Sequence, residues 1–144
     1  MKRKDDHLVC ALLLGEYEDG RLLMREVFRD AGWRLLEAHD RKHALHHLTR
    51  DPVQVVITTC DVGKWDWRKV LESLRRMTRP PQLIVTSPTA DEYLWSEVLN
   101  RGGYDVLSQP FQRDEVERVI ASARRHYDPL PRKTASGSFG FSAA

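Results

Sequence analysis

The sequence predicts a doubly wound α/β domain, with five parallel strands in the flavodoxin-like order 2-1-3-4-5. Three observations support this fold class. Five short apolar segments alternate along the chain with five segments in which apolar residues recur at helical spacing. The connections between strands contain helices of about 10 to 15 residues, which parallel pairing requires. The apolar segments are continuous, as is typical of strands that helices cover on both faces.

The predicted strands are rich in leucine and β-branched residues, and β-branched residues pack well on a pleated surface. The third strand is the central one: it begins at Val53, after the break at Asp51-Pro52, and runs into the small polar residues 58–61. In open α/β sheets, functional side chains lie beyond the carboxyl ends of the central strands. The five strands are expected at residues 7–14, 33–38, 53–57, 83–86 and 104–107.

The predicted helices each carry an apolar stripe, and several have a start or stop signal. A polar turn at residues 15–19 precedes the first helix, and Gly32 is a stop signal at its end. Asp40 is a suitable N-cap for the second helix. The fourth covers residues 92–101 and ends at Gly102. In chain order, the residues expected to face the core are Leu23, Val27 and Ala31; Ala44, Leu45 and Leu48; Trp67, Val70, Leu71 and Leu74; Leu94 and Val98; and Val116, Val119, Ile120 and Ala123.

Length and composition favour one domain, residues 1–127, followed by a flexible tail, residues 128–144. The chain has 144 residues, of which 41% are hydrophobic and 31% charged, as is typical of a globular protein that buries a substantial core. The tail is rich in glycine, serine and alanine and has no periodicity.

A cytoplasmic location is expected, with neither a membrane nor a nucleic acid as partner. No apolar run approaches the roughly 20 residues of a membrane span. The net charge of +2 gives no electrostatic argument for nucleic-acid binding. Cys10 and Cys60 have neither metal-site nor CxxC spacing, so both are interpreted as small buried hydrophobic residues in a reducing compartment.

The segment from Arg101 to Phe111, RGGYDVLSQPF, is similar to the R-G-A-x-D-Y-L-x-K-P-F motif of bacterial receiver domains. The central strand and the residues after it also fit that family without a gap. From Leu8 to Tyr127 the chain therefore resembles the receiver domain of a two-component response regulator. The resemblance implies phosphorelay signalling, in which Mg²⁺, an acidic pair and a lysine assist phosphoryl transfer to an aspartate. A hydroxyl residue and an aromatic residue then switch conformation.

The chain departs from that family at most of its functional positions. In the alignment that the resemblance implies, Thr59 replaces the phospho-acceptor and Gln109 replaces the lysine. A threonine hydroxyl cannot form an acyl phosphate, and one carboxylate is a weak Mg²⁺ site. The sequence therefore predicts a pseudo-receiver: a signalling protein that is not an enzyme, binds no cofactor and acts by protein–protein interaction. The remaining equivalent positions are Gly15 and Glu16 for the acidic pair, Thr86 for the switch hydroxyl and Val106 for the switch aromatic.

Several alternatives remain open at this stage. Asp61 is two residues beyond Thr59 and could serve as an unusual acceptor in a phosphorylation-competent, Mg²⁺-dependent receiver, although its spacing to Gly63 and Asp66 opposes this. Glu16, Glu18 and Asp19 are interpreted as a solvated turn in preference to a cation site. His43 and His47 have i, i+4 spacing, but an exposed helix face is favoured over a metal site. A flavin-binding protein has the same topology, but no loop feature favours flavin.

The resemblance also implies a partner face formed by the fourth helix, the fifth strand and the fifth helix, which receiver domains use for dimers and output. Tyr93, Trp95 and Val106 are the candidate residues of this face, and a homodimer is one possible assembly. Trp65 is a further candidate for partner contact, because exposed aromatic residues are enriched at binding hot spots. The alternative for each aromatic is packing on a neighbouring helix.

Overall fold

The computed structural model describes residues 8–127 and has one five-stranded parallel sheet in the order β2-β1-β3-β6-β7. This is the predicted flavodoxin-like order, because β6 and β7 are the fourth and fifth strands of the sheet along the chain. The predicted tail, residues 128–144, lies outside the described residues. The strands are β1 (Cys10–Leu14), β2 (Arg34–Ala38), β3 (Val55–Thr59), β6 (Gln82–Ser87) and β7 (Asp105–Ser108).

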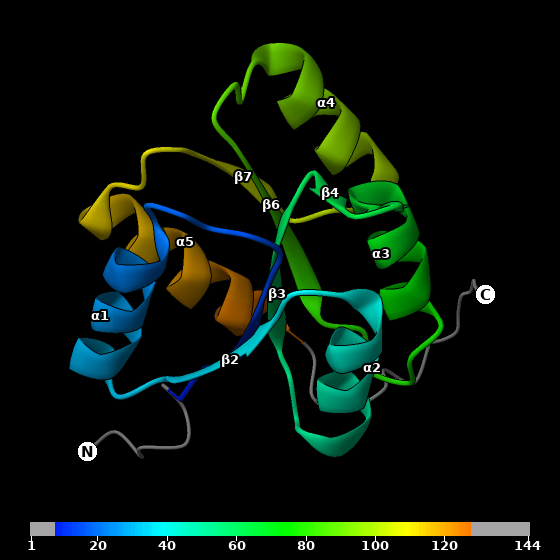
Figure 1. The fold of residues 1–144 in the computed structure, drawn as a ribbon, viewed down its shortest axis with the longest axis horizontal. Coiled ribbons are helices and arrows are strands. Elements are labelled where there is room, and N and C mark those ends of the chain that lie inside the picture. The colour runs from blue at the N-terminus through cyan, green and yellow to red at the C-terminus, as the bar shows by residue number, and fades with distance from the viewer. Residues whose placement is uncertain (1–7, 128–144) are drawn as a thin grey trace.

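Within the described residues, five helices cover the two faces of the sheet (Figure 1). On one face, α1 (Arg21–Ala31) and α5 (Arg113–His126) pack over a core that includes Leu13, Phe28 and Ile120. On the other face, α2 (Arg41–Arg50), α3 (Trp67–Arg75) and α4 (Glu92–Arg101) pack over a separate core. Alternate residues of each strand therefore enter different cores, which explains why the strands are continuously apolar.

The predicted helix boundaries have the expected local causes. The Asp40 carboxylate accepts a 2.9 Å hydrogen bond from the backbone N–H of His43, as an N-cap does. Gly32 has φ 74° and Gly102 has φ 105°, so each ends its helix in the left-handed region that favours glycine. Among the described residues, no helix has the length and apolar character needed to cross a membrane.

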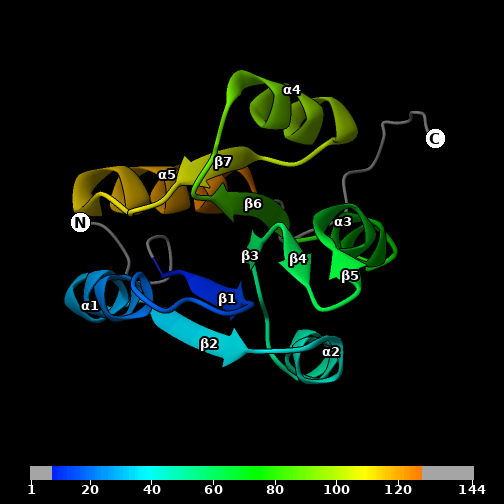
Figure 2. The ribbon, with the colours of Figure 1, turned by 45° about the horizontal axis from the view of Figure 1, so that its top comes forward.

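A short hairpin that the sequence analysis did not foresee follows β3. It pairs β4 (Asp61–Val62) with β5 (Trp65–Asp66) in antiparallel fashion, and Gly63 has φ 63° in the turn. Figure 2 shows it between the end of β3 and the start of α3. Trp65 is only 6% exposed and packs in the core beneath α2 and α3, so partner contact, one of the two interpretations left open for it, is wrong and packing is confirmed. The guanidinium of Arg41 lies 5.6 Å from the centre of its ring.

Candidate functional site

Four of the predicted site residues line a crevice of about 430 Å³ at the carboxyl ends of β1, β3 and β6. Its lining includes Glu16, Thr59, Thr86 and Gln109, which come from four separate segments of the chain. Parallel strands bring these segments together because all their carboxyl ends lie at the same edge of the sheet. The other lining residues are Glu18, Asp19, Cys60, Ser87 and Pro88.

Gly15, at the end of β1, lies against Thr59 of the crevice lining. Gly15 has φ 117°, and a Cβ atom built on it would lie 2.3 Å from Oγ1 of Thr59. That hydroxyl donates a 2.9 Å hydrogen bond to the backbone carbonyl of Asp61. The space beside Gly15 is therefore filled by Thr59, and the structure has no room there for a second carboxylate.

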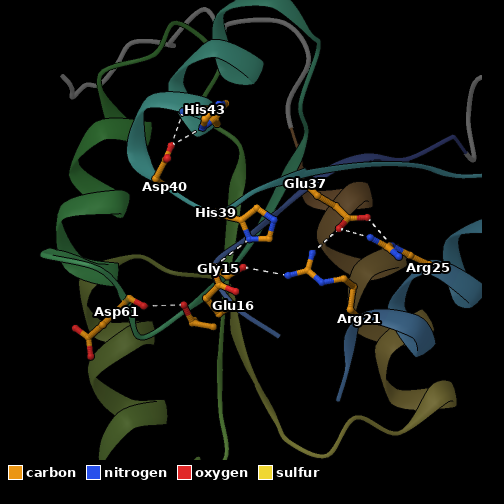
Figure 3. A network of polar contacts seen from close by, with 10 residues as sticks. Gly15, Glu16, Arg21, Arg25, Glu37, His39, Asp40, His43 and Asp61 are labelled. Carbon is orange, nitrogen blue, oxygen red and sulfur yellow. Dashed lines mark hydrogen bonds and ion pairs between the residues drawn. The ribbon is translucent and has the colours of Figure 1, made fainter. Parts of the chain in front are cut away.

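The carboxylates nearest the crevice are on its rim. The side chain of Glu16 is 80% exposed, and one of its oxygens lies 3.2 Å from Nδ1 of His39. Figure 3 shows this pair beside Gly15. Glu18 and Asp19 are also exposed, and Gln109 supplies no positive charge. Within residues 8–127, no three histidine, cysteine or acidic side chains converge as a metal site would require.

Asp61, the alternative acceptor, is outside the crevice. It is exposed in β4 and is absent from the crevice lining. In Figure 3 its carboxylate points away from Gly15 and Glu16. The hairpin causes this arrangement, because it directs the backbone carbonyl of Asp61 toward Thr59 and its side chain toward solvent.

Thr86 is buried and is held by a residue that the sequence analysis treated only as part of a polar turn. The hydroxyls of Tyr17 and Thr86 are 2.9 Å apart, and Oγ1 of Thr86 also lies 3.4 Å from the carbonyl oxygen of Thr58. Tyr17 is 3% exposed, and its ring centre is 5.9 Å from that of Phe111. Burial raises the pKa of the Tyr17 phenol, so the group is neutral at physiological pH. No pattern in residues 16–19 of the sequence signalled that this ring turns inward.

An ionic cluster fixes the loop after β1 from the side of α1 (Figure 3). Arg21 and Arg25 both bind the carboxylate of Glu37 on β2, and Nη2 of Arg21 donates to the carbonyl of Gly15 at 3.4 Å. Hydrogen bonding from Arg25, reinforced by Arg21, holds the pKa of Glu37 below its ordinary value. The backbone conformation of Gly15 is thus supported by a neighbouring side chain as well as by its contact with Thr59.

Comparison with known proteins identifies the family to which this chain belongs. The sequence profile described as "Response regulator receiver domain" matches residues 12–121. The chain belongs to this family. Members are signalling domains of two-component systems, so the protein is a receiver-type signalling protein.

The chain is also similar to a curated relative and to solved structures. The chain is 32% identical over 118 residues to the uncharacterized transcriptional regulatory protein YrkP of Bacillus subtilis (strain 168). That match covers 80% of this chain and 49% of the relative, so the chain spans about half the relative's length.

The solved structures show the shared fold. The signal receiver domain of an HD domain-containing protein from Pseudomonas fluorescens Pf-5 has a TM-score of 0.71 at 22% identity, over 82% of this chain and 95% of that one. The Saccharomyces cerevisiae Ssk1 receiver domain, solved with the histidine phosphotransfer signaling protein Ypd1, has a TM-score of 0.70 at 9% identity, over 81% and 89% of the two chains.

In this receiver domain, α4, β7 and α5 border a groove of about 330 Å³. Two aromatic residues of α4 are exposed: Trp95 lines the groove and is 48% exposed, and Tyr93, which is absent from the lining, is 77% exposed. The indole N–H of Trp95 donates to the Asp105 carboxylate at 3.3 Å, which holds the ring against β7. Val106 lines the groove but is only 9% exposed, so it adds little to the accessible surface.

The groove carries more negative than positive charge. Its lining includes four carboxylates and the guanidinium of Arg118. Glu92 and Glu115 form no ion pair with another of the described residues. The carboxylate of Asp91 caps α4 by accepting a hydrogen bond from the backbone N–H of Leu94. The carboxylates are Asp91, Glu92, Asp105 and Glu115.

Proposed function

We propose that this receiver domain is a non-enzymatic pseudo-receiver, which signals by binding a protein partner and is not phosphorylated on an aspartate. The observation that supports it best is the contact between Gly15 and Thr59. Thr59 has a hydroxyl where the family has the acceptor carboxylate, and Gly15 has no side chain where the family has one acid of the pair. The Thr59 side chain fills the space that a side chain at position 15 would need. The predicted cytoplasmic location belongs to this proposal, and the free thiols of Cys10 and Cys60 are compatible with it.

The chemistry of the crevice argues against phosphoryl transfer to Thr59. A hydroxyl is a poor nucleophile without a neighbouring base, and the crevice lining contains no histidine or lysine. The Thr59 proton is already engaged with the carbonyl of Asp61. A phosphoryl group placed here would face the carboxylates of Glu16, Glu18 and Asp19 with no side-chain cation in the lining to offset its charge.

A phosphodonor experiment tests this part of the proposal. The full chain is incubated with acetyl phosphate and Mg²⁺, and its intact mass is measured, with a phosphorylatable receiver in the same tube to show that the donor is active. We expect no added phosphoryl group on this chain. An adduct lost in mild base would overturn the proposal, and its absence from Asp61→Asn would identify Asp61 as the acceptor. A base-stable adduct that is absent from Thr59→Val would instead be a phosphate ester of Thr59.

The partner face proposed is the exposed surface of α4 beside the groove. Exposed tyrosine and tryptophan residues are frequent hot spots because they bury a large area at low conformational entropy. The excess of carboxylates around the groove favours a partner segment that carries arginine or lysine. A second copy of this chain is one partner to test, because receiver domains form dimers through this face.

A comparison of matched baits tests the partner face. Wild-type protein and the double variant Tyr93→Ala/Trp95→Ala are used in parallel captures, and proteins recovered only by the wild type are purified and titrated against both. Sedimentation of the chain alone measures self-association. We expect the variant to weaken binding by at least about tenfold, as for loss of a hot spot. Equal binding by both baits would exclude this face.

A further inference from the structure

We propose that the buried hydrogen bond between Tyr17 and Thr86 fixes the loop between β6 and α4, and so holds the exposed face of α4 in one position without a ligand in the crevice. This hydrogen bond would regulate the partner face. The inference rests on the proposed function in one respect: it takes the exposed face of α4 as the surface that binds the protein partner. The aromatic residue involved comes from the loop after β1 and not from β7.

The contact is well placed to act as a fixed support. Tyr17 and Thr86 are 3% and 1% exposed, so water does not compete for their 2.9 Å hydrogen bond. Packing against Phe111 limits the rotation of the Tyr17 ring. Phe111 in turn lies against Gly20, where a Cβ atom would approach its ring to 2.4 Å, so no larger residue fits behind it. Packing therefore orients the phenol toward Thr86 independently of the hydrogen bond between them.

Separate hydrogen bonds hold the short segment that joins Thr86 to α4. The next residue, Ser87, accepts from the backbone N–H of Thr89 at 3.1 Å, and its carbonyl accepts from the backbone N–H of Gln109 at 3.0 Å. Two residues after Thr89, Asp91 caps α4 through the backbone N–H of Leu94. The loop between the buried hydroxyl and the first turn of the helix is thus tied at each end and in the middle.

Trp95, one of the exposed aromatic residues of α4, is in that first turn. The backbone N–H of Trp95 donates to the carbonyl of Asp91 at 3.0 Å, and its indole N–H donates to Asp105. A shift of the loop would move Asp91, and the indole of Trp95 would then lose its alignment with Asp105. The resonance of that indole N–H is therefore a direct reporter of the position of α4.

Conservative variants isolate the hydroxyl contact. Tyr17→Phe keeps the ring and its packing on Phe111, and Thr86→Val keeps the shape of the side chain. Tyr104→Phe is the matched control, because the Tyr104 hydroxyl bonds to Ser122 and His126 of α5. Amide shifts and hydrogen exchange are measured on the full chain by NMR, with no partner present.

In Tyr17→Phe and in Thr86→Val we expect shifted amides at residues 87–95, a displaced Trp95 indole resonance and about fivefold faster exchange in α4, the factor that corresponds to one net hydrogen bond. The double variant should resemble the more affected single variant, because both remove the same contact. In Tyr104→Phe we expect changes in α5 and an unchanged Trp95 resonance.

Two results would overturn the inference: changes confined to residues that touch Tyr17, with α4 unaffected, or a uniform acceleration of exchange throughout the domain. Neither result depends on a partner. If the Trp95 resonance moves but the Tyr93→Ala/Trp95→Ala bait binds normally, the coupling stands and the partner face fails. If that bait loses binding while Tyr17→Phe leaves α4 unchanged, the partner face stands and the coupling fails.

Discussion

Gly15 and Thr59 occupy the same small space at the carboxyl ends of β1 and β3, where a Cβ atom on Gly15 would lie 2.3 Å from the Thr59 hydroxyl. Each residue limits what the other position accepts. An acidic side chain at position 15 requires both a smaller neighbour and a backbone that leaves φ 117°. The two departures from the family pattern are therefore physically linked.

This linkage predicts the stability of Gly15→Ala. Backbone strain at positive φ and the overlap with Thr59 should together lower the free energy of unfolding by about 2–4 kcal/mol. Adding Thr59→Ala should recover part of that loss, because it removes the clashing hydroxyl. Urea unfolding of the single and double variants measures both effects.

The control for this experiment is Gly63→Ala. Gly63 also has positive φ, 63°, but a Cβ atom there meets nothing within 4 Å. Its loss should be about 1 kcal/mol from conformation alone. Equal losses at Gly15 and Gly63 would show that Thr59 does not restrict position 15.

The ionic cluster around Glu37 predicts a pH-dependent stability difference. Because Arg25 and Arg21 lower the pKa of Glu37 in the folded state, its contribution is complete above the ordinary value of 4.5 and is lost as the pH falls through the folded value. At pH 7, Glu37→Gln should unfold about 0.5–1 kcal/mol more easily than wild type, as for a partly exposed ion pair. The difference should shrink below pH 4.5.

Chemical unfolding at several pH values provides the measurement, with Glu72→Gln as a control. Glu72 is exposed, and none of the described residues forms an ion pair with it. A gap between wild type and Glu37→Gln that stays constant from pH 7 to about pH 3 would contradict the assigned cause.

The two thiols should react slowly. Burial raises the pKa of both Cys10 and Cys60, so little thiolate is present at neutral pH. Cys60 lines the crevice and should react with a disulfide reagent before Cys10, which is 8% exposed. Rates measured on Cys10→Ser and Cys60→Ser assign each phase. A Cys60 rate equal to that of free cysteine would refute the prediction.

The aromatic residues of α4 should differ in their contribution to folding. Tyr93 is 77% exposed, so Tyr93→Ala should change the free energy of unfolding by less than about 0.5 kcal/mol. Trp95→Ala should lower it by about 1–2 kcal/mol, because half of the ring is buried and its hydrogen bond to Asp105 is lost. Thermal and urea unfolding test this, and a large loss in Tyr93→Ala would mean that the residue packs more closely than its exposure indicates.

Periodicity and local signals predicted the strands and helices well, because they depend on neighbouring residues. Asp40 and Gly32 act as the cap and stop expected of them, and α4 has the predicted bounds. The hairpin was missed since no strand was predicted at Val62 and Trp65, although they flank a two-residue turn with glycine. The burial of Trp65 follows from that pairing.

The site was predicted in part. The resemblance assigned Glu16, Thr59, Thr86 and Gln109 to the functional positions of the family, and these four residues line one crevice. The position of Tyr17 was not predictable from spacing, because a residue between two exposed acids gives no sign that its ring turns inward. Likewise, the contact of Gly15 with Thr59 depends on backbone angles that only the folded chain defines.

Arg68 on α3 holds the Glu97 carboxylate of α4 through two donors at 2.9 and 2.7 Å, and Arg101 lies 3.4 Å from the same carboxylate. These groups are partly open to solvent, so dissolved ions screen the attraction between them. The screening length is about 8–10 Å at physiological ionic strength and becomes shorter as salt is added. The ion pair between α3 and α4 should therefore weaken as salt is added. The ionic strength of the surroundings would then set how freely α4 moves.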